Sequence, residues 1–148
     1  MLVHEVELSE AVMETLILFS RAWEAENSCF GYRANTRSDI EGNRVFLAES
    51  DEGAAGYLFG HIRTAENESS VIPEGSRCFE VEERYVIPSR RCEGLGAALF
   101  RCAEDTLKGE AGFITLSTAT KNWRSILHFY LDELDMTFWS ARLFKKLG

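Results

Sequence analysis

Two arginines and two glycines stand close together in the stretch RRCEGLG, between a β-branched run that ends at Pro88 and an alanine-rich apolar segment. A strand, a glycine-rich turn and a helix in this order bind phosphate in several folds, because the helix N-terminus presents unpaired N–H groups and a partial positive charge. Glycine lets the backbone approach an anion without a Cβ atom in the way. Arg90 and Arg91 add cationic donors. The stretch predicts a phosphate site, with a plain strand-to-helix turn as the alternative.

Two common nucleotide-binding motifs fit this stretch poorly. A P-loop requires the pattern GxxxxGK[ST], which the chain does not contain. A dinucleotide-binding fingerprint requires Gly or Ala at its third glycine site, where this chain has Leu99. In a dinucleotide-binding domain, the strand before the fingerprint is the first strand of the domain. In this chain, three predicted strands precede it.

The same residues resemble a third motif. The segment RCEGLG, residues 91–96, fits the (Q/R)xxGx(G/A) motif of the GNAT superfamily of acyl-CoA N-acyltransferases, and the flanking YVIP and AALF match the block around it. Downstream, residues 116–136 are similar to the family's strand, Asn-led helix and FY…LGF ending. Together these motifs cover residues 79–148. Two features depart from the family pattern: the helix from Asn122 is one residue longer before its Phe-Tyr pair, and Asp135 stands where the family often has glycine.

The resemblance implies that acetyl-CoA is the co-substrate, and it assigns the residues that bind it. The strand before the glycine turn offers main-chain groups to the pantetheine arm, the loop wraps the pyrophosphate, and an asparagine hydrogen-bonds the arm. The residues implied are Tyr85, Val86, Arg91, Cys92, Glu93, Gly94, Leu95, Gly96, Ala97 and Asn122. By itself, Asn122 could equally be a residue that begins a helix. No metal is expected.

Carboxylates on the strand before the glycine turn are candidates for a general base. Acetyl transfer needs a neutral amine, because an ammonium has no lone pair, and alkyl amines have a pKa of roughly 10. A base must therefore take a proton, directly or through water. Alternation along a strand places Glu80 and Glu82 on one face and Glu83 on the other. The family often has an acidic residue here, so we predict Glu80 or Glu82 as the base, with solvated surface carboxylates as the alternative.

Tyr130 is the candidate general acid. The leaving thiolate must be protonated or stabilised, and a thiol has a pKa of roughly 8.5, so a nearby tyrosine hydroxyl can donate its proton. Tyr130 lies on the apolar face of a helix predicted over residues 121–134, and the resemblance implies that this face points toward the co-substrate. A core tyrosine with a satisfied hydroxyl is the alternative.

The elements that must position these residues follow from hydrophobic periodicity. Alternating and β-branched runs predict strands over residues 2–8, 44–50, 54–64, 77–87, 113–119 and 136–147. Helical spacing predicts helices over residues 9–24, 95–108 and 121–134. This order is that of one mixed α/β domain over residues 1–148, with a βαβ unit in its second half. The resemblance implies a GNAT-like acyl-CoA N-acyltransferase fold, with a central, mostly antiparallel sheet, splayed parallel strands and flanking helices.

Composition narrows the classes of function. The chain carries 24 acidic and 16 basic side chains, a net charge of −8, which argues against nucleic-acid binding and can attract cationic partners. No apolar run is long enough to span a bilayer, and no membrane association is expected. The N-terminus lacks the pattern of a signal peptide, so we expect a cytoplasmic protein. The four cysteines lack the spacing of a disulfide scaffold or a zinc site.

These observations predict an N-acetyltransferase that moves an acetyl group from acetyl-CoA to a primary amine, in particular a small cationic amine of the polyamine or aminoglycoside kind. Two alternatives remain. One is a protein or peptide N-acetyltransferase, and the other is a non-catalytic acyl-CoA-binding regulatory module on the same fold, because fold alone does not fix function. A homodimer also remains open.

Overall fold

A five-stranded sheet with the order β1-β2-β3-β4-β5 forms the centre of the computed structural model, which describes residues 1–148. The strands are β1 (Leu2–Val6), β2 (Arg44–Ser50), β3 (Gly53–Thr64), β4 (Arg77–Val86) and β5 (Phe113–Leu116). Neighbouring strands are antiparallel except β4 and β5, which are parallel. The helical elements are α1 (Glu10–Glu26), α2 (Arg37–Ile40), η1 (Pro88–Arg90), α3 (Leu95–Leu107), α4 (Trp123–His128) and η2 (Phe129–Glu133). The predicted mixed α/β fold is confirmed.

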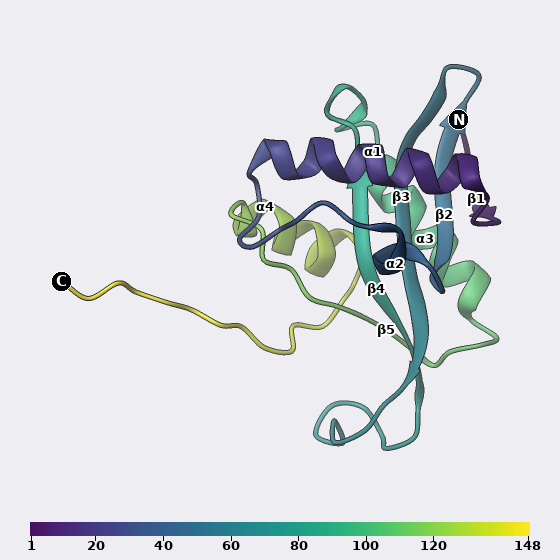
Figure 1. Ribbon diagram of the computed structural model, residues 1–148. Coiled ribbons are helices and arrows are strands. Elements are labelled where there is room, and N and C mark those ends of the chain that lie inside the picture. Colours follow the sequence, from purple (N-terminus) through teal and green to yellow (C-terminus); the bar gives the residue numbers. More distant parts are fainter.

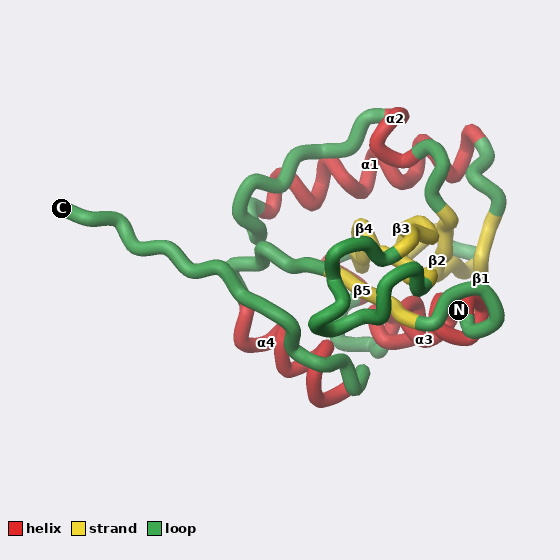
Figure 2. The backbone as a smooth tube through the Cα atoms, turned by 90° about the horizontal axis from the view of Figure 1, so that it is seen from below, coloured by secondary structure: helices red, strands yellow, loops and turns green.

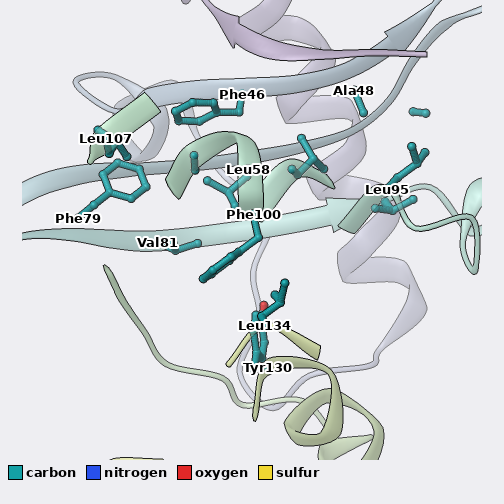
Figure 3. Packing of buried hydrophobic residues seen from close by; sticks show 14 residues of the cluster. Phe46, Ala48, Leu58, Phe79, Val81, Leu95, Phe100, Leu107, Tyr130 and Leu134 are labelled. Atoms are coloured by element: carbon teal, nitrogen blue, oxygen red, sulfur yellow. The ribbon is translucent and has the colours of Figure 1, made fainter. Parts of the chain in front are cut away.

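Helices cover both faces of the sheet. Figures 1 and 2 show α1 and α2 on one face and α3 and α4 on the other. The α3 face holds the larger apolar cluster, in which Phe46, Phe79 and Phe100 are almost fully buried (Figure 3). The α1 face holds a second cluster built around Leu16 and Tyr57. Strands β2 and β3 contribute to both clusters, which explains their long runs of apolar residues.

Strands β4 and β5 separate part-way along their length. Their pairing ends at Val81 and Leu116, so residues 82–86 of β4 have no partner on β5. On its other side, β4 is bulged against β3, where Phe59 pairs with Glu83 and the next residue pairs with Val81. One residue of β4, Glu82, is therefore the extra residue of the bulge. The splayed parallel strands implied by the resemblance are present.

The last helix contains a π-helical turn. Helix α4 ends at His128 and continues directly into η2, where the hydrogen bonds span five residues. A π turn accommodates one extra residue, which accounts for the longer spacing between Asn122 and its Phe-Tyr pair. The turn after η2 places Asp135 at φ 56°, a left-handed conformation that favours glycine.

The predicted strand over residues 136–147 is wrong for the single chain. Residues 135–148 form no strand and extend away from the domain (Figures 1 and 2). A strand forms only where another strand pairs with its backbone, and none lies beside this segment. We refer to residues 136–148 as the C-terminal tail.

None of the helices has both the length and the apolar character that are needed to cross a bilayer.

Candidate active site

A cleft of about 820 Å³ opens where β4 and β5 separate. Its walls come from the C-terminal end of α1, residues 28–32, the N-terminal end of α3, the segment after β5, and α4 with η2. All the residues predicted to bind acetyl-CoA line this cleft except Glu93. Of the predicted catalytic residues, Tyr130 and Glu82 line the cleft, whereas Glu80 does not.

The N-terminus of α3 points unpaired N–H groups into the cleft region. The first helical hydrogen bond joins the Ala98 N–H to the Gly94 carbonyl at 3.0 Å. The N–H groups of residues 95–97 therefore have no partner within the helix. Gly94 has a φ of 81° and Cys92 has a φ of 65°, so two residues of the loop adopt the left-handed backbone conformation before the helix begins. Such a loop presents several donors to one anion.

Gly96 lies against the end of the Arg84 side chain. A Cβ atom at this position would collide with the guanidinium of Arg84, which reaches across the cleft from β4. The same Arg84 donates from Nε to the Tyr130 hydroxyl at 3.0 Å. Its guanidinium also lies over the Phe129 ring, 4.6 Å from the ring centroid. The missing side chain of Gly96 thus makes room for a cation that joins the α3 N-terminus to η2.

Both arginines of the loop have acidic partners in this structure. Arg91 lies 2.8 Å from Glu26 of α1 and donates from Nε to the Val86 carbonyl. Arg90 donates to Glu93 at 3.0 Å. The positive character of the loop therefore comes chiefly from the α3 N-terminus, and the arginine charges become available only if a ligand competes with these carboxylates.

The carboxylate of Glu80 is held in an ion pair outside the cleft. Arg63 donates to its Oε1 at 3.0 Å, and the Thr115 hydroxyl donates to the same oxygen at 2.7 Å. Glu82 is exposed beside the cleft and lies 3.3 Å from His61 Nδ1. The structure thus places only one of the two predicted bases, Glu82, where a ligand in the cleft can reach it.

Glu83 was predicted to point away from Glu80, and this prediction is wrong. The bulge at Glu82 shifts the alternation of β4, so Glu83 faces the α1 side of the sheet, as Glu80 does. Its Oε1 accepts hydrogen bonds from the hydroxyls of Tyr57 and Tyr32, at 2.8 and 3.1 Å, and from Asn35 Nδ2 at 2.9 Å.

All the hydrogen-bond donors to Glu83 are neutral groups. Burial raises the pKa of Glu83 above its ordinary value, although the three hydrogen bonds act in the opposite direction. No arginine or lysine forms an ion pair with this carboxylate. A buried anion without a cationic partner is costly, and a cationic ligand in the cleft would remove much of that cost. The sequence analysis assumed strict alternation along the strand, and it therefore did not select Glu83 as a candidate base.

Three aromatic rings stack along the wall of the cleft, and one of them, Tyr32, donates to Glu83. The Trp23 ring stacks on Tyr32 at a centroid distance of 4.3 Å and on Tyr85 at 5.2 Å. All three rings line the cleft. The Tyr85 hydroxyl donates to Glu26, and burial and this carboxylate raise the pKa of Tyr85 to about 12. Aromatic faces beside a carboxylate form a surface that suits ammonium groups.

Tyr130 is largely buried, but its hydroxyl is at the cleft. Its ring packs against Phe100 at a centroid distance of 6.2 Å, as Figure 3 shows for the labelled side chains. Its hydroxyl accepts the Arg84 hydrogen bond, which leaves the hydroxyl proton free to point elsewhere. Asn122 immediately precedes α4 at the cleft wall, and its side chain makes no capping hydrogen bond. His128 is exposed and bonds to Asp132 at 2.7 Å.

The chain matches the family model of the Acetyltransferase (GNAT) family over residues 11–134. It therefore belongs to the GNAT family of acetyltransferases. The matched region contains the α3 loop, the bulged strand β4 and Tyr130. No curated protein matches the sequence significantly.

Solved structures of other proteins have the same fold. A mutant of the BH1408 protein from Bacillus halodurans superposes with a TM-score of 0.72 at 14% identity, over 100% of both chains. An aminoglycoside 6'-N-acetyltransferase from Acinetobacter haemolyticus gives 0.67 at 19% identity, over 100% of this chain and 99% of that one. An aminoglycoside N-acetyltransferase in complex with CoA gives 0.64 at 15% identity, over 99% and 98%. At these identities the likeness establishes the fold.

No cluster of three or more His, Cys, Asp or Glu side chains has the arrangement of a metal site.

Proposed function

We propose that this GNAT protein transfers the acetyl group of acetyl-CoA to a small cationic amine. The observation that carries the proposal is the composition of the cleft. One end offers the unpaired N–H groups of the α3 N-terminus, which suit a pyrophosphate. Another wall offers the carboxylates of Glu82 and Glu83 with three aromatic rings, which suit an ammonium. One cleft thus has features suited to an anionic co-substrate and a cationic acceptor.

The residues around the α3 loop fit acetyl-CoA. The left-handed Gly94 and the N–H groups of residues 95–97 form a cradle for phosphate oxygens, and Arg91 can exchange Glu26 for a phosphate. The edge of β4 near Tyr85 and Val86 has no strand beside it, and it can bond the amide groups of the pantetheine arm where Arg91 releases the Val86 carbonyl. Asn122 faces the same cleft across from them. Acetyl-CoA supplies a thioester carbon that an uncharged amine can attack.

The acceptor must lose a proton before it reacts. We assign proton acceptance to the β4 carboxylates that reach the cleft, Glu82 and Glu83, acting directly or through water. Glu83 is the better placed of the two, because Tyr32, Asn35 and Tyr57 fix one of its oxygens and leave the other free. Its raised pKa also brings its basicity closer to that of the proton donor. The ion pair with Arg63 makes Glu80 a poor base.

The leaving thiolate needs a proton or a compensating charge. We assign the proton to the Tyr130 hydroxyl, which is held in place by the Arg84 hydrogen bond at 3.0 Å. The guanidinium of Arg84 is close enough to stabilise negative charge that develops at the phenolate or the sulfur. Because Gly96 leaves room for it, Arg84 lies between the phosphate-binding loop and this hydroxyl.

The test offers the protein a panel of acceptors and measures the release of free thiol from acetyl-CoA with each of them. The panel contains a polyamine, an aminoglycoside, an uncharged-side-chain amino acid and a lysine-containing peptide, with product masses measured for each. We expect the polyamine or the aminoglycoside to be acetylated fastest, and the amino acid slowest, because only the first two present several ammonium groups.

The outcomes separate the proposal from its alternatives. Preferential acetylation of the peptide would replace the small acceptor with a protein. Tight acetyl-CoA binding without any acetylated product would identify a regulatory module that binds acyl-CoA. Either result would overturn the proposed reaction while leaving the family assignment unchanged.

A further inference from the structure

Two carboxylates of the cleft are connected by a row of aromatic side chains. Glu83 accepts a hydrogen bond from the Tyr32 hydroxyl at 3.1 Å, and the Tyr32 ring stacks on Trp23 at a centroid distance of 4.3 Å. The Trp23 ring also stacks on Tyr85, whose hydroxyl donates to Glu26 Oε2 at 2.5 Å. Glu83 and Glu26 therefore stand at the two ends of this row of contacts, and both line the cleft.

Glu26 differs from Glu83 because it already has a cationic partner. The Arg91 guanidinium forms a bidentate ion pair with Glu26, with Nη1 2.8 Å from Oε1 and Nη2 3.0 Å from Oε2. The same guanidinium lies over the Tyr85 ring, 5.3 Å from the ring centroid. A carboxylate beside an aromatic face is an arrangement that also suits an ammonium group. Arg91 is thus an internal cation in a position where a ligand cation could bind.

The position of Glu26 on α1 increases its attraction for cations. Glu26 is the last residue of the helix, where unpaired carbonyl groups carry a partial negative charge. The last turn of α1 contains no basic residue of its own. Only 23% of the Glu26 side chain is exposed, so water compensates its charge incompletely. When Arg91 moves away, Glu26 therefore favours another cation.

The side chain that pairs with Glu26 also belongs to the proposed phosphate site. Arg91 lies in the loop before α3 and lines the cleft. A guanidinium binds phosphate in the same bidentate geometry as carboxylate. Because Arg91 Nε also donates to the Val86 carbonyl at 2.9 Å, a move onto phosphate releases both that carbonyl and Glu26. Glu26 Oε1 then has no donor, since Arg91 is its only partner.

We propose that acetyl-CoA exposes Glu26 as a second acceptor-binding carboxylate, which binds one ammonium group of an acceptor that carries at least two. This inference rests on the proposed function and narrows its class of acceptors. Phosphate draws Arg91 away, and the ammonium group takes the place of the guanidinium against Glu26 and Tyr85. The amine that reacts lies at the Glu83 end of the aromatic row. The two substrates then bind cooperatively, and each strengthens the binding of the other by the same factor.

The experiment measures the dissociation constant of the linear triamine spermidine by calorimetry, with and without saturating CoA. CoA carries the pyrophosphate but has no acetyl group to transfer. In the wild-type protein, we expect CoA to lower the spermidine dissociation constant at least about tenfold. This effect should disappear in Glu26→Gln, which has no charge to expose. Glu14→Gln is the matched control and should keep the effect, because Glu14 is an exposed residue of the same helix that does not line the cleft.

Arg91→Ala tests the same mechanism in the opposite direction. In this variant Glu26 has no cationic partner before CoA binds. Spermidine should therefore bind without CoA at least about fivefold more tightly than to the wild-type protein, and CoA should add little. In turnover assays, Glu26→Gln should raise KM for spermidine with little change in kcat, because it removes a binding contact that is the same before and during the reaction.

The outcomes separate this inference from the proposed function. A CoA effect that persists in Glu26→Gln would contradict the inference, because attraction between CoA phosphates and spermidine would then explain the effect. Equal spermidine affinity of the wild-type protein with and without CoA would also contradict it. Both results are compatible with acetylation of spermidine. Cooperative binding without any acetylated product would overturn the proposed function alone, and failure of spermidine to bind even with CoA would overturn both.

Discussion

At the scale of single residues, the proposed reaction depends on the half-buried carboxylate of Glu83 and on the hydroxyl of Tyr130. Glu83 is held by neutral donors only, so its charge is incompletely compensated until a cation binds. Tyr130 is fixed by a packed ring and a guanidinium, so its proton can point into the cleft. Both arrangements are pre-organised, because the positions of the polar atoms are set by elements that the core holds in place.

Replacing Tyr130 with Phe tests the general acid. The change keeps the ring and its packing against Phe100 but removes the proton. The free energy of unfolding should fall by about 1 kcal/mol or less. The turnover number should fall roughly 10²–10⁴-fold, while the acetyl-CoA dissociation constant stays nearly the same. Thermal unfolding, calorimetric binding and thiol release measure these quantities.

The opposite pattern would identify Tyr130 as a core residue only. In that case Tyr130→Phe would lower the melting temperature and keep the turnover number. Tyr57→Phe is a useful comparison. It also removes a buried hydroxyl, but that hydroxyl donates to Glu83.

Replacing Glu83 with Gln tests the base through its pH dependence. Burial raises the pKa of Glu83, so kcat/KM of the wild type should rise with pH through a value above that of an ordinary glutamate. In Glu83→Gln this rise should disappear, and kcat should fall roughly 10²–10⁴-fold. A variant with an unchanged pH profile would exclude Glu83 as the base and leave Glu82 or water.

The same variant should affect stability in a defined direction. A carboxyl with a raised pKa stabilises the folded state at low pH, and this contribution is lost as the pH rises through the folded pKa. Glu83→Gln removes the ionisation and keeps an oxygen that accepts hydrogen bonds. The free energy of unfolding of Glu83→Gln minus that of the wild type should therefore be larger at neutral pH than at pH values below the ordinary glutamate pKa.

At the scale of elements, three irregularities build the site. The bulge in β4 turns Glu83 toward the acceptor side, the separation of β4 from β5 opens the cleft, and the π turn of η2 sets Tyr130 beside Arg84. Each of them interrupts the regular repeat of side-chain directions along a strand or helix. Hydrophobic patterns in a sequence reveal only such regular repeats. The first five strands, the main helices and the α3 loop could therefore be predicted, whereas the orientation of Glu83 could not.

A Gly96→Glu substitution tests the α3 loop. The new side chain would displace Arg84 and put a negative charge at the helix N-terminus, where phosphate is expected. Acetyl-CoA binding should weaken at least tenfold in calorimetry. Gly109→Glu is the control, because a side chain there meets nothing within 4 Å. A folded Gly96→Glu protein that binds acetyl-CoA as tightly as the wild type would remove the loop from the site.

An Asp135→Gly substitution tests the turn after η2. Glycine adopts the left-handed φ of 56° without strain and removes a negative charge near the end of a helix. The free energy of unfolding should rise by about 0.5–1 kcal/mol. Asp135→Asn removes the charge alone and should give a smaller gain. Chemical denaturation of the three proteins measures both contributions, and a loss of stability in Asp135→Gly would show that the aspartate side chain stabilises this turn.

At the scale of the whole molecule, charge is unevenly distributed along the chain. The net charge of −8 is the sum of −11 on residues 1–135 and +3 on residues 136–148. The composition alone predicted attraction of cations, but it could not show that the opposite charges occupy separate parts of the molecule. The last predicted strand shows a similar limit: its pattern is that of a strand, and its partner is absent from the single chain.

The central claim is that the cleft acetylates a cationic amine with acetyl-CoA. The most direct measurement is kcat/KM for thiol release with a linear polyamine, determined at low and at high ionic strength on the wild-type protein. The account predicts measurable turnover that falls as salt rises, because screening weakens attraction between the ammonium groups and the Glu82 and Glu83 carboxylates. Fastest turnover of a neutral or anionic acceptor, without any dependence on salt, would contradict it.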